Sequence, residues 1–285
     1  MKSTHGVLAI NKPKHMTSFD VCNHIKKITK SKVGHTGTLD PDATGVLLVC
    51  VGGTTKYVPF LMGQSKIYES TLILGTHTHT LDTSGEVLET KDIQPQSKET
   101  WQDLVHSMID THHLAVPQVS AIKVDGKRLY AQKDFDLDLL PIKEMIVYDA
   151  HLISWCDTSV TTQMHVNTGS YIRTLNVELA RRSSNIGTTQ DIIRIQNGPI
   201  TLDLCQDLPQ NLEDCVFLDA KKLFSSYPCI ELDDITPIIH GKIISFESDE
   251  PLLCVIRDEL PFAMLEKTDV GYKVKRGLWY EDVSY

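Results

Sequence analysis

The residues best suited to chemistry lie in one short loop, residues 34–45, with the sequence Gly-His-Thr-Gly-Thr-Leu-Asp-Pro-Asp-Ala-Thr-Gly. Its glycines, its proline and its short oxygen-bearing side chains are typical of a tight loop and disfavour a helix or strand. The apolar run 46–51 follows directly and has the length and branching of a strand buried on both faces. Asp40 is therefore a carboxylate on an irregular loop anchored by core structure, which is where reactive groups are commonly held.

Two other interpretations of this loop remain open on local chemistry. Asp before Pro readily initiates an Asx-turn, so Asp40 can be purely structural. Residues 40–45 also look like the start of a calcium loop, but such a loop needs a glutamate at its twelfth position, which here is Val51. Neither interpretation explains why the loop also holds several other polar side chains, namely His35, Thr36, Thr38 and Asp42.

Length and composition set the class of protein. With 285 residues, 41% of them hydrophobic, the chain can bury a full core and suits one large domain plus a small one. Its seven cysteines are an odd number with no Cys-x-x-Cys pair, which argues for reduced thiols and against a disulfide framework or a zinc site. We see no signal peptide, no apolar run long enough to span a membrane and no cofactor motif. We therefore expect a cytoplasmic protein that needs no cofactor and binds no metal.

Hydrophobic periodicity and capping residues predict the elements that position the loop. We expect a strand over 7–10, a helix capped by Thr17 or Ser18, and a strand over 67–74 with period-two alternation. An amphipathic helix capped by Ser97 should pack into the core through its apolar stripe, which consists of Trp101, Leu104, Val105, Met108 and Ile109.

The second half of the chain predicts further strands and a helix. A lysine- and glycine-bearing stretch after Pro117, followed by an acidic-apolar run, indicates a hairpin or mobile thumb over about residues 117–145. Ranges 145–155 and 160–166 have the pattern of paired strands. Gly169 then breaks the pattern, and Ser170 can cap a helix that carries Tyr171 and Arg173. Short apolar segments after residue 228 indicate a small β domain.

The motifs taken together resemble one known family. Residues 34–41 and 43–47 resemble the catalytic-loop signature of the TruB family of tRNA pseudouridine synthases. Four other segments resemble that family's remaining motifs, in the family's order. Residues 11–13 and 17–21 resemble its first motif, and residues 67–68 with the turn residues that follow resemble its second strand and turn (Gly75, Thr78, Thr80, Asp82 and Gly85). Residues 120–128 resemble its substrate-gripping segment, and residues 169–175 its arginine motif. The resemblance covers roughly residues 6–200, and several motifs in order are much more specific than one.

The resemblance implies a fold and a domain organisation. The fold is an α/β (α+β) pseudouridine synthase architecture, with a mixed, mainly antiparallel bent sheet flanked by helices and a small C-terminal β (PUA-like) domain. We expect residues 1–228 to form the catalytic domain and residues 229–285 the small domain.

It also implies an activity, which is isomerisation of the T-loop uridine of tRNA, U55, to pseudouridine. Asp40 is then the nucleophile, Arg173 its guanidinium partner, and Tyr68 the residue that stacks on the uracil and accepts a proton. His35 helps hold the substrate loop open, Tyr171 and Ile192 line the uracil pocket, and Lys12 either supports the loop or touches phosphate. The expected partner of a monomeric enzyme is the T-arm stem-loop of tRNA, without a membrane or a small-molecule cofactor.

Net charge bears on the RNA partner. The whole chain has a formal charge of −9, yet residues 1–60 hold 8 Lys and Arg against 3 Asp and Glu, a net +5. Binding depends on the local field at the footprint rather than on the sum. The basic side chains after residue 25 either lie along RNA phosphate or form a solvated face, and they are Lys26, Lys27, Lys30 and Lys32.

The chain departs from the family pattern at three positions that bear on substrate grip. His79 stands where an aspartate is more usual, Val119 where a tyrosine is common, and Ile193 removes one of a basic pair beside Arg194. The alternative function is an RNA chaperone that folds tRNA with catalysis secondary. The sequence also leaves three routes open for Asp40, which are attack at the sugar, attack at the ring and base-assisted elimination.

Overall fold

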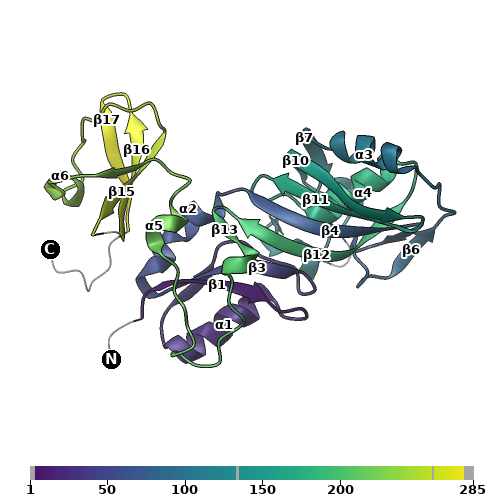
Figure 1. Ribbon diagram of the computed structural model, residues 1–285, viewed down its shortest axis with the longest axis horizontal. Coiled ribbons are helices and arrows are strands. Elements are labelled where there is room, and N and C mark those ends of the chain that lie inside the picture. The colour runs from purple at the N-terminus through teal and green to yellow at the C-terminus, as the bar shows by residue number, and fades with distance from the viewer. Residues whose placement is uncertain (1–3, 133–134, 259, 279–285) are drawn as a thin grey trace. The chain divides into compact units, whose positions relative to one another are not determined.

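The computed structural model describes residues 4–132, 135–258 and 260–278, and the chain divides into two compact units. Unit 1 consists of residues 1–64 and 196–285, and unit 2 of residues 65–195 (Figure 1). Among the described residues, no helix has the length and apolar character needed to cross a membrane.

Unit 1 is built around a fully buried strand. β3 (Thr44–Val51) pairs antiparallel with β1 (Gly6–Lys12) and with the short β2 (Val33–His35). α1 (Ser18–Thr29) begins at a capping box in which Thr17 and Asp20 exchange side-chain-to-backbone hydrogen bonds. Shorter elements complete this part of the unit: η1 (Gly52–Tyr57), α2 (Val58–Met62), β13 (Ile200–Thr201), η4 (Leu202–Leu204) and α5 (Ala220–Leu223).

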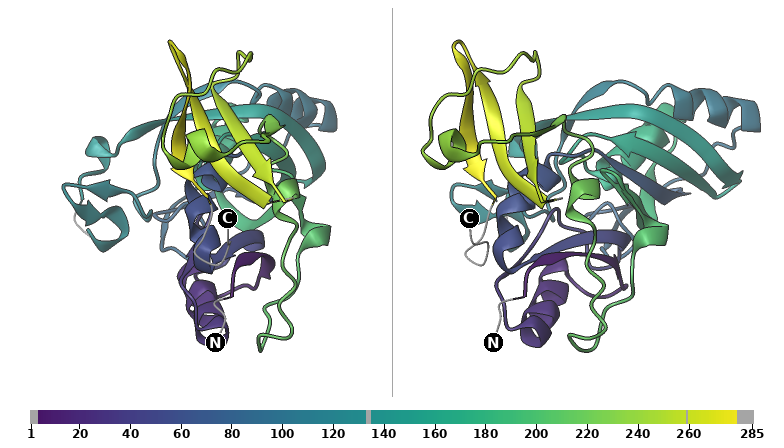
Figure 2. Two further views of the ribbon diagram at one scale, coloured as in Figure 1. Left: turned by 90° about the vertical axis from the view of Figure 1, so that its left-hand side faces the viewer. Right: turned by 60° about the vertical axis from the view of Figure 1, so that its left-hand side comes forward.

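The end of the chain adds a second sheet to unit 1. Its strand order is β14 (Cys229–Glu231), β15 (Leu252–Arg257), β16 (Leu260–Thr268) and β17 (Gly271–Gly277), with α6 (Thr236–Ile239) between β14 and β15. The first pair is parallel and the others are antiparallel. Figure 2 shows β15 to β17 as neighbouring strands of a small twisted sheet, drawn in yellow. The expected small C-terminal β module is confirmed.

Unit 2 contains a sheet with the strand order β12 (Gly187–Asn197, whose last two residues belong to unit 1), β4 (Lys66–Leu74), β11 (Ser159–Val166), β10 (Ile142–Cys156) and β7 (Thr111–Ala115). The pairings β4–β11, β11–β10 and β10–β7 are antiparallel. Two hairpins stand apart from it, β5 (Thr76–Thr78) with β6 (Val87–Thr90) and β8 (Lys123–Val124) with β9 (Lys127–Arg128). Single turns of 3₁₀ helix follow at η2 (Leu129–Ala131) and η3 (Leu137–Leu139).

Helices α3 (Lys98–His106) and α4 (Ile172–Arg182) pack on this sheet (Figure 1). Trp101 of α3 and Leu175 and Leu179 of α4 share one core cluster with alternate residues of β11. The amide of Asn176 joins α4 to β4 through the hydroxyl of Ser70. Arg173 lies three residues before Asn176, so the two side chains leave α4 on the same side of the helix.

Most predicted elements are confirmed, including the strands at 7–10, 46–51 and 67–74, the paired strands, the hairpin after Pro117 and the helix after Ser97. The predicted cap at Ser170 is wrong. Tyr171 occupies the N-cap position of α4 with no side-chain cap, and the hydroxyl of Ser170, one residue earlier, donates to the side chain of Asn167. The helix therefore begins after Tyr171 and carries Arg173 in its first turn.

Candidate active site

Asp40 lies half-buried on the loop between β2 and β3, with its backbone held immediately upstream. The hydroxyl of Ser18, the first residue of α1, accepts from the Leu39 N–H at 2.9 Å and lies 3.2 Å from the Leu39 carbonyl. The Ala43 N–H closes a turn onto the Asp40 carbonyl at 3.1 Å. Gly37 and Gly45 have φ angles of +140° and +99°, in a region that favours glycine, so the loop needs both of them.

Lys12 fixes the loop immediately downstream of Asp40. Its side chain is fully buried, with 0% exposure, and its ammonium donates to the carbonyls of Pro13, Met16 and Pro41. A buried ammonium is costly unless its three donors are used, and these carbonyls use them. The backbone on either side of Asp40 is thus tied to two separate elements, α1 through Ser18 and β1 through Lys12.

His35 and Thr36 lead into the loop from β2. The Nδ1 atom of His35 accepts from the Gly37 N–H at 3.3 Å, which turns the half-buried imidazole toward its own loop. Thr36 is fully buried, donates its N–H to the Leu48 carbonyl of β3 at 3.1 Å, and lies 3.3 Å from the amide of Asn197. The loop therefore starts from a strand that is anchored in the core.

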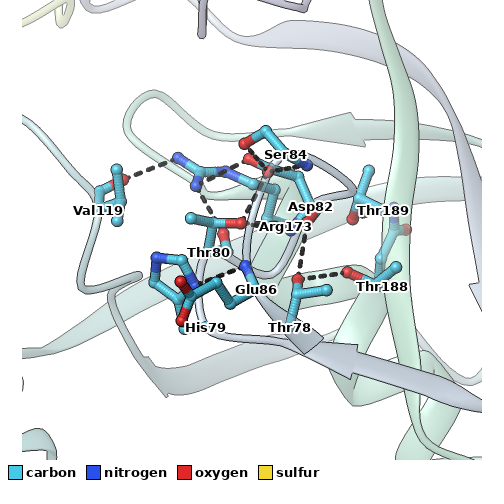
Figure 3. Close-up of polar contacts among 11 residues, drawn as sticks. Thr78, His79, Thr80, Asp82, Ser84, Glu86, Val119, Arg173, Thr188 and Thr189 are labelled. Atoms are coloured by element: carbon cyan, nitrogen blue, oxygen red, sulfur yellow. Dashed lines mark hydrogen bonds and ion pairs between the residues drawn. The ribbon is translucent and has the colours of Figure 1, made fainter. Parts of the chain in front are cut away.

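In unit 2 the guanidinium of Arg173 is 3% exposed and is held by several acceptors (Figure 3). Its Nη1 donates to the Thr80 carbonyl at 2.8 Å and to Asp82 Oδ2 at 3.3 Å, and its Nη2 donates to the Val119 carbonyl at 3.0 Å. A charge this deeply buried is stable only when paired and hydrogen-bonded. The first turn of α4 is thereby tied to the turn between β5 and β6 and to the segment before β8.

The turn between β5 and β6 is itself a dense set of hydrogen bonds (Figure 3). Asp82 Oδ1 accepts from the Thr80 hydroxyl at 2.8 Å and from the backbone and hydroxyl of Ser84 at 3.0 and 2.5 Å. His79 closes the turn, because its Nδ1 accepts from the Glu86 N–H at 3.0 Å. Arg173 contacts only the backbone carbonyl of Val119. This hydrogen bond therefore does not depend on which side chain stands at position 119.

Tyr68 lies half-buried on β4, opposite Met164 of β11. Arg194 of β12 donates from Nη1 to the Tyr68 hydroxyl at 3.3 Å, and its guanidinium carbon lies 5.9 Å from the ring centroid. Tyr68, Tyr171 and Ile192 are all partly buried hydrophobics packed against one core cluster. All three residues thus lie at the margin of a single core. Lys143 also places its ammonium 5.7 Å from the Tyr171 ring centroid.

Lys66 is a second buried cation near Tyr68. It lies two residues earlier on β4, is 4% exposed, and its ammonium lies 3.3 Å from the Thr168 hydroxyl. Burial, together with the positive charge of Arg194, lowers the pKa of the Lys66 ammonium from 10.5 to about 7. This group is therefore poised to gain or lose a proton near neutral pH.

The candidate residues of the sequence analysis fall into two sets. Lys12, His35 and Asp40 lie in unit 1, while the unit 2 set comprises Tyr68, Tyr171, Arg173 and Ile192. The pairing of Asp40 with Arg173 joins residues of different units and stays a prediction.

Sequence reasoning assigned no role to Asp82 and Arg194, which contact Arg173 and Tyr68, or to Lys66, which is buried two residues before Tyr68. Asp82 was visible as a motif member in a turn, and Arg194 as the remaining half of a basic pair. For Lys66 the only available signal was its place two residues before Tyr68, on the same face of the strand.

Unit 1 holds a carboxylate on a rigid loop, and unit 2 holds a phenol beside a buried guanidinium and an apolar margin. A carboxylate can serve nucleophilic attack, and a phenol can serve proton transfer.

Comparison with known proteins assigns the class. The chain is 30% identical over 285 residues to "tRNA pseudouridine synthase B" of Clostridium tetani, covering 95% of this chain and 98% of that protein. It is 34% identical over 248 residues to the protein of the same name from Caldanaerobacter subterraneus, covering 85% and 87%. The fold is similar to that of a chain in "Structure of H/ACA RNP bound to a substrate RNA containing 2'-deoxyuridine", with a TM-score of 0.73 at 17% identity, covering 97% and 86% of the two chains.

These findings define an RNA pseudouridine synthase, an isomerase. Residues 25–172 match the family model "TruB family pseudouridylate synthase (N terminal domain)", and the chain belongs to that family. The resemblance read from the five motifs is confirmed.

The lowered pKa of Lys66 should make the stability of the folded chain depend on pH. Between pH 7 and 10.5 the unfolded chain keeps the Lys66 proton that the folded chain has released, so the free energy of unfolding should rise with pH. Relative to Lys66→Met, wild type should gain up to about 1.4 kcal/mol per pH unit across that window, and the difference should be flat below pH 7. Urea denaturation of both proteins at pH 6, 7, 8 and 9 measures it.

The exposed Lys91 provides the control, since Lys91→Met should run parallel to wild type across the series. Parallel curves for Lys66→Met and wild type would show that the Lys66 proton is bound equally in the folded and unfolded chains.

Proposed function

We propose that this synthase isomerises the T-loop uridine of tRNA, U55, to pseudouridine, with Asp40 as the nucleophile. The observation that carries the proposal is the rigid mounting of Asp40, whose neighbours Leu39 and Pro41 are held by Ser18 and Lys12. A nucleophile held in one geometry avoids much of the entropic cost of attack. The curated relatives, both named as tRNA pseudouridine synthases, support tRNA as the substrate.

Arg173 is the proposed partner of the Asp40 carboxylate. Its position at the start of α4, fixed by Thr80, Asp82 and Val119, gives a preorganised positive charge that needs no rearrangement during reaction. A guanidinium favours the ionised form of a carboxylate that it contacts, and only the ionised form attacks a carbon. This role also accounts for the burial of a charge at the first turn of a helix.

Tyr68, Tyr171 and Ile192 form the proposed binding surface for the uracil. Their common position at the margin of one core cluster supports this assignment, because a planar base stacks well on an aromatic ring and an apolar side chain. Tyr68 also carries a hydroxyl that can exchange a proton with the base. His35 helps to hold the loop of the RNA open, and Lys12 acts through its hydrogen bond to Pro41.

The reaction is an isomerisation, so atoms and electrons balance without a cofactor. The glycosidic bond to nitrogen 1 breaks, a bond to carbon 5 forms, one proton leaves carbon 5 and one arrives at nitrogen 1. Attack of Asp40 at the sugar, attack at the ring and base-assisted elimination all satisfy this balance. All three need an ionised carboxylate near the base.

We further propose that the enzyme works as a cytoplasmic monomer on the T-arm stem-loop. All seven cysteines are free thiols, which supports a reducing compartment. Lys26, Lys27, Lys30 and Lys32 are exposed on α1 and just beyond it, which suits contact with phosphate.

The nucleophile is tested by Asp40→Asn. We expect turnover to fall below detection while the Kd for tRNA stays within about tenfold, because affinity comes mostly from phosphate and shape contacts. Pseudouridine formation and filter binding are measured with the same purified protein. Asp42→Asn removes an exposed carboxylate two residues away and is the matched control, expected to keep turnover. Turnover retained by Asp40→Asn would exclude Asp40 as the nucleophile.

The Tyr68 hydroxyl is tested by Tyr68→Phe, which keeps the ring and removes the acid. Turnover should fall by about 10²-fold or more, the usual contribution of a positioned proton-transfer group, while RNA binding is unchanged. Tyr68→Leu should lose the stack as well as the chemistry. Tyr148→Phe changes an exposed tyrosine on the same sheet and should behave as wild type. A wild-type rate for Tyr68→Phe would leave Tyr68 a purely positional role.

Substrate shape is tested with two RNAs of identical sequence around the target. A stem-loop that copies the T-arm should be modified readily, whereas an unstructured strand should be poor, because folded loops present an extrudable base. Binding of the stem-loop should weaken steeply as the salt concentration rises. Replacing Lys26 and Lys27 by Gln should reduce the slope of log K against log salt concentration by about one for each phosphate contact that is lost. Equal rates on both RNAs would contradict recognition of loop shape. An unchanged slope would show that the two lysines are solvated and do not contact phosphate.

A further inference from the structure

The Tyr68 side of the sheet carries two buried cations. Lys66 and Tyr68 are two residues apart on β4, and Ile192 and Arg194 are two residues apart on the adjacent strand β12. Because successive side chains of a strand alternate between its faces, each pair lies on one face of its strand. The exposures are 4% for Lys66 and 1% for Arg194, so both charges are removed from bulk water. The positive charge of Arg194 acts against the charged form of Lys66, which shows that the two cations lie close together.

The contact between Arg194 and Tyr68 has a defined direction. A guanidinium carries only donors and cannot accept a hydrogen bond, so in this 3.3 Å contact the phenolic oxygen is the acceptor. The proton of the Tyr68 hydroxyl must then point away from Arg194. Tyr68 itself is only half-buried, whereas Arg194 lies beneath it in the core. The contact therefore leaves the Tyr68 proton free to be donated to a group on the opposite side of the oxygen.

The two cations also differ in permanence. Burial and the charge of Arg194 lower the pKa of Lys66 to about 7, while a guanidinium keeps its proton throughout the physiological range. Lys66 therefore releases its proton near neutral pH, and the hydrogen bond to the phenol comes from Arg194. Negative charge on the Tyr68 oxygen would be stabilised by a hydrogen bond to an ionised donor in a site of low dielectric constant.

We propose that Arg194 is a positioning residue for pseudouridine formation, which directs the Tyr68 hydroxyl at the base and stabilises negative charge on its oxygen. The inference rests on the proposed proton-transfer role of Tyr68. In the reaction the ring gains a proton on nitrogen 1 and loses one from carbon 5. A phenol that gives the first becomes a phenoxide, and by taking the second it returns to its starting state, so the exchange is balanced and Arg194 only donates hydrogen bonds.

A double-mutant cycle separates this role from simple packing. Single-turnover rates are measured with excess enzyme for wild type, Arg194→Gln, Tyr68→Phe and the double variant. Arg194→Gln should slow wild type by about 10- to 100-fold, the effect of losing one preorganised donor, with the Kd for RNA within about threefold. In the Tyr68→Phe background the same change should cost at most about twofold, because the hydroxyl through which it acts is absent.

Two further variants guard against loss of the fold. Arg194→Lys keeps a cation and a donor and should recover part of the rate lost in Arg194→Gln. Arg182→Gln removes an arginine of the same unit that contacts Glu178 and the Ser107 carbonyl, and it should keep the wild-type rate. Thermal melting of each variant identifies any change in rate that follows from unfolding alone.

The outcomes distinguish the inference from the function on which it rests. A full effect of Arg194→Gln on Tyr68→Phe, or no effect on wild type, would overturn the role of Arg194. No recovery in a folded Arg194→Lys would also contradict it. A wild-type rate for Tyr68→Phe alone would instead remove the proton-transfer role of Tyr68, and that variant leaves Arg194 untouched.

Discussion

The buried guanidinium of Arg173 is the constraint on which unit 2 depends. The Arg173 side chain is 3% exposed, and its two terminal nitrogens donate to the Thr80 carbonyl, the Asp82 carboxylate and the Val119 carbonyl. These acceptors lie on a turn between two strands and on the segment that precedes a hairpin. The helix start, the turn and the hairpin base are therefore fixed together, because moving any one of them would leave a buried charge without a partner. The Arg173 side chain is thus both a proposed catalytic group and a group that holds the fold of unit 2 together.

Unit 1 uses the same physical device for its candidate nucleophile. The Lys12 ammonium is fully buried and gives its three protons to backbone carbonyls, one of which belongs to Pro41. On the other side the Ser18 hydroxyl bridges both polar atoms of Leu39. Asp40 itself has no regular secondary structure, yet the chain on each side of it has little freedom. A loop can then be irregular enough to present a carboxylate and still be stiff enough to hold it.

The sequence predicted best those elements in which a single hydrophobic pattern determines the type of secondary structure. The alternation in 160–166 and the unbroken apolar run 46–51 each permit one burial arrangement, and both strands formed as expected. The cap at Ser170 failed because α4 begins one residue later than expected, with Tyr171 in the N-cap position. A shift of one residue at a helix start lies below what spacing in the sequence can decide. The same limit applies to Asp82, whose neighbours Thr80 and Ser84 are visible in sequence while its contact with Arg173, 91 residues away, is not.

The difference between Arg194 and Lys66 shows why burial has to be known before a basic residue is interpreted. In sequence both are basic residues in or beside apolar strands, where a solvated edge is the ordinary expectation. In the structure both are buried near one phenol, and their chemistry diverges because a guanidinium retains its proton where an ammonium releases it. A lysine in place of Arg194 would keep a donor but lose the fixed, planar fork of the guanidinium, so it should direct the Tyr68 hydroxyl only in part. Because Lys66 can release its proton near neutral pH, the folded protein buries less positive charge beside Arg194.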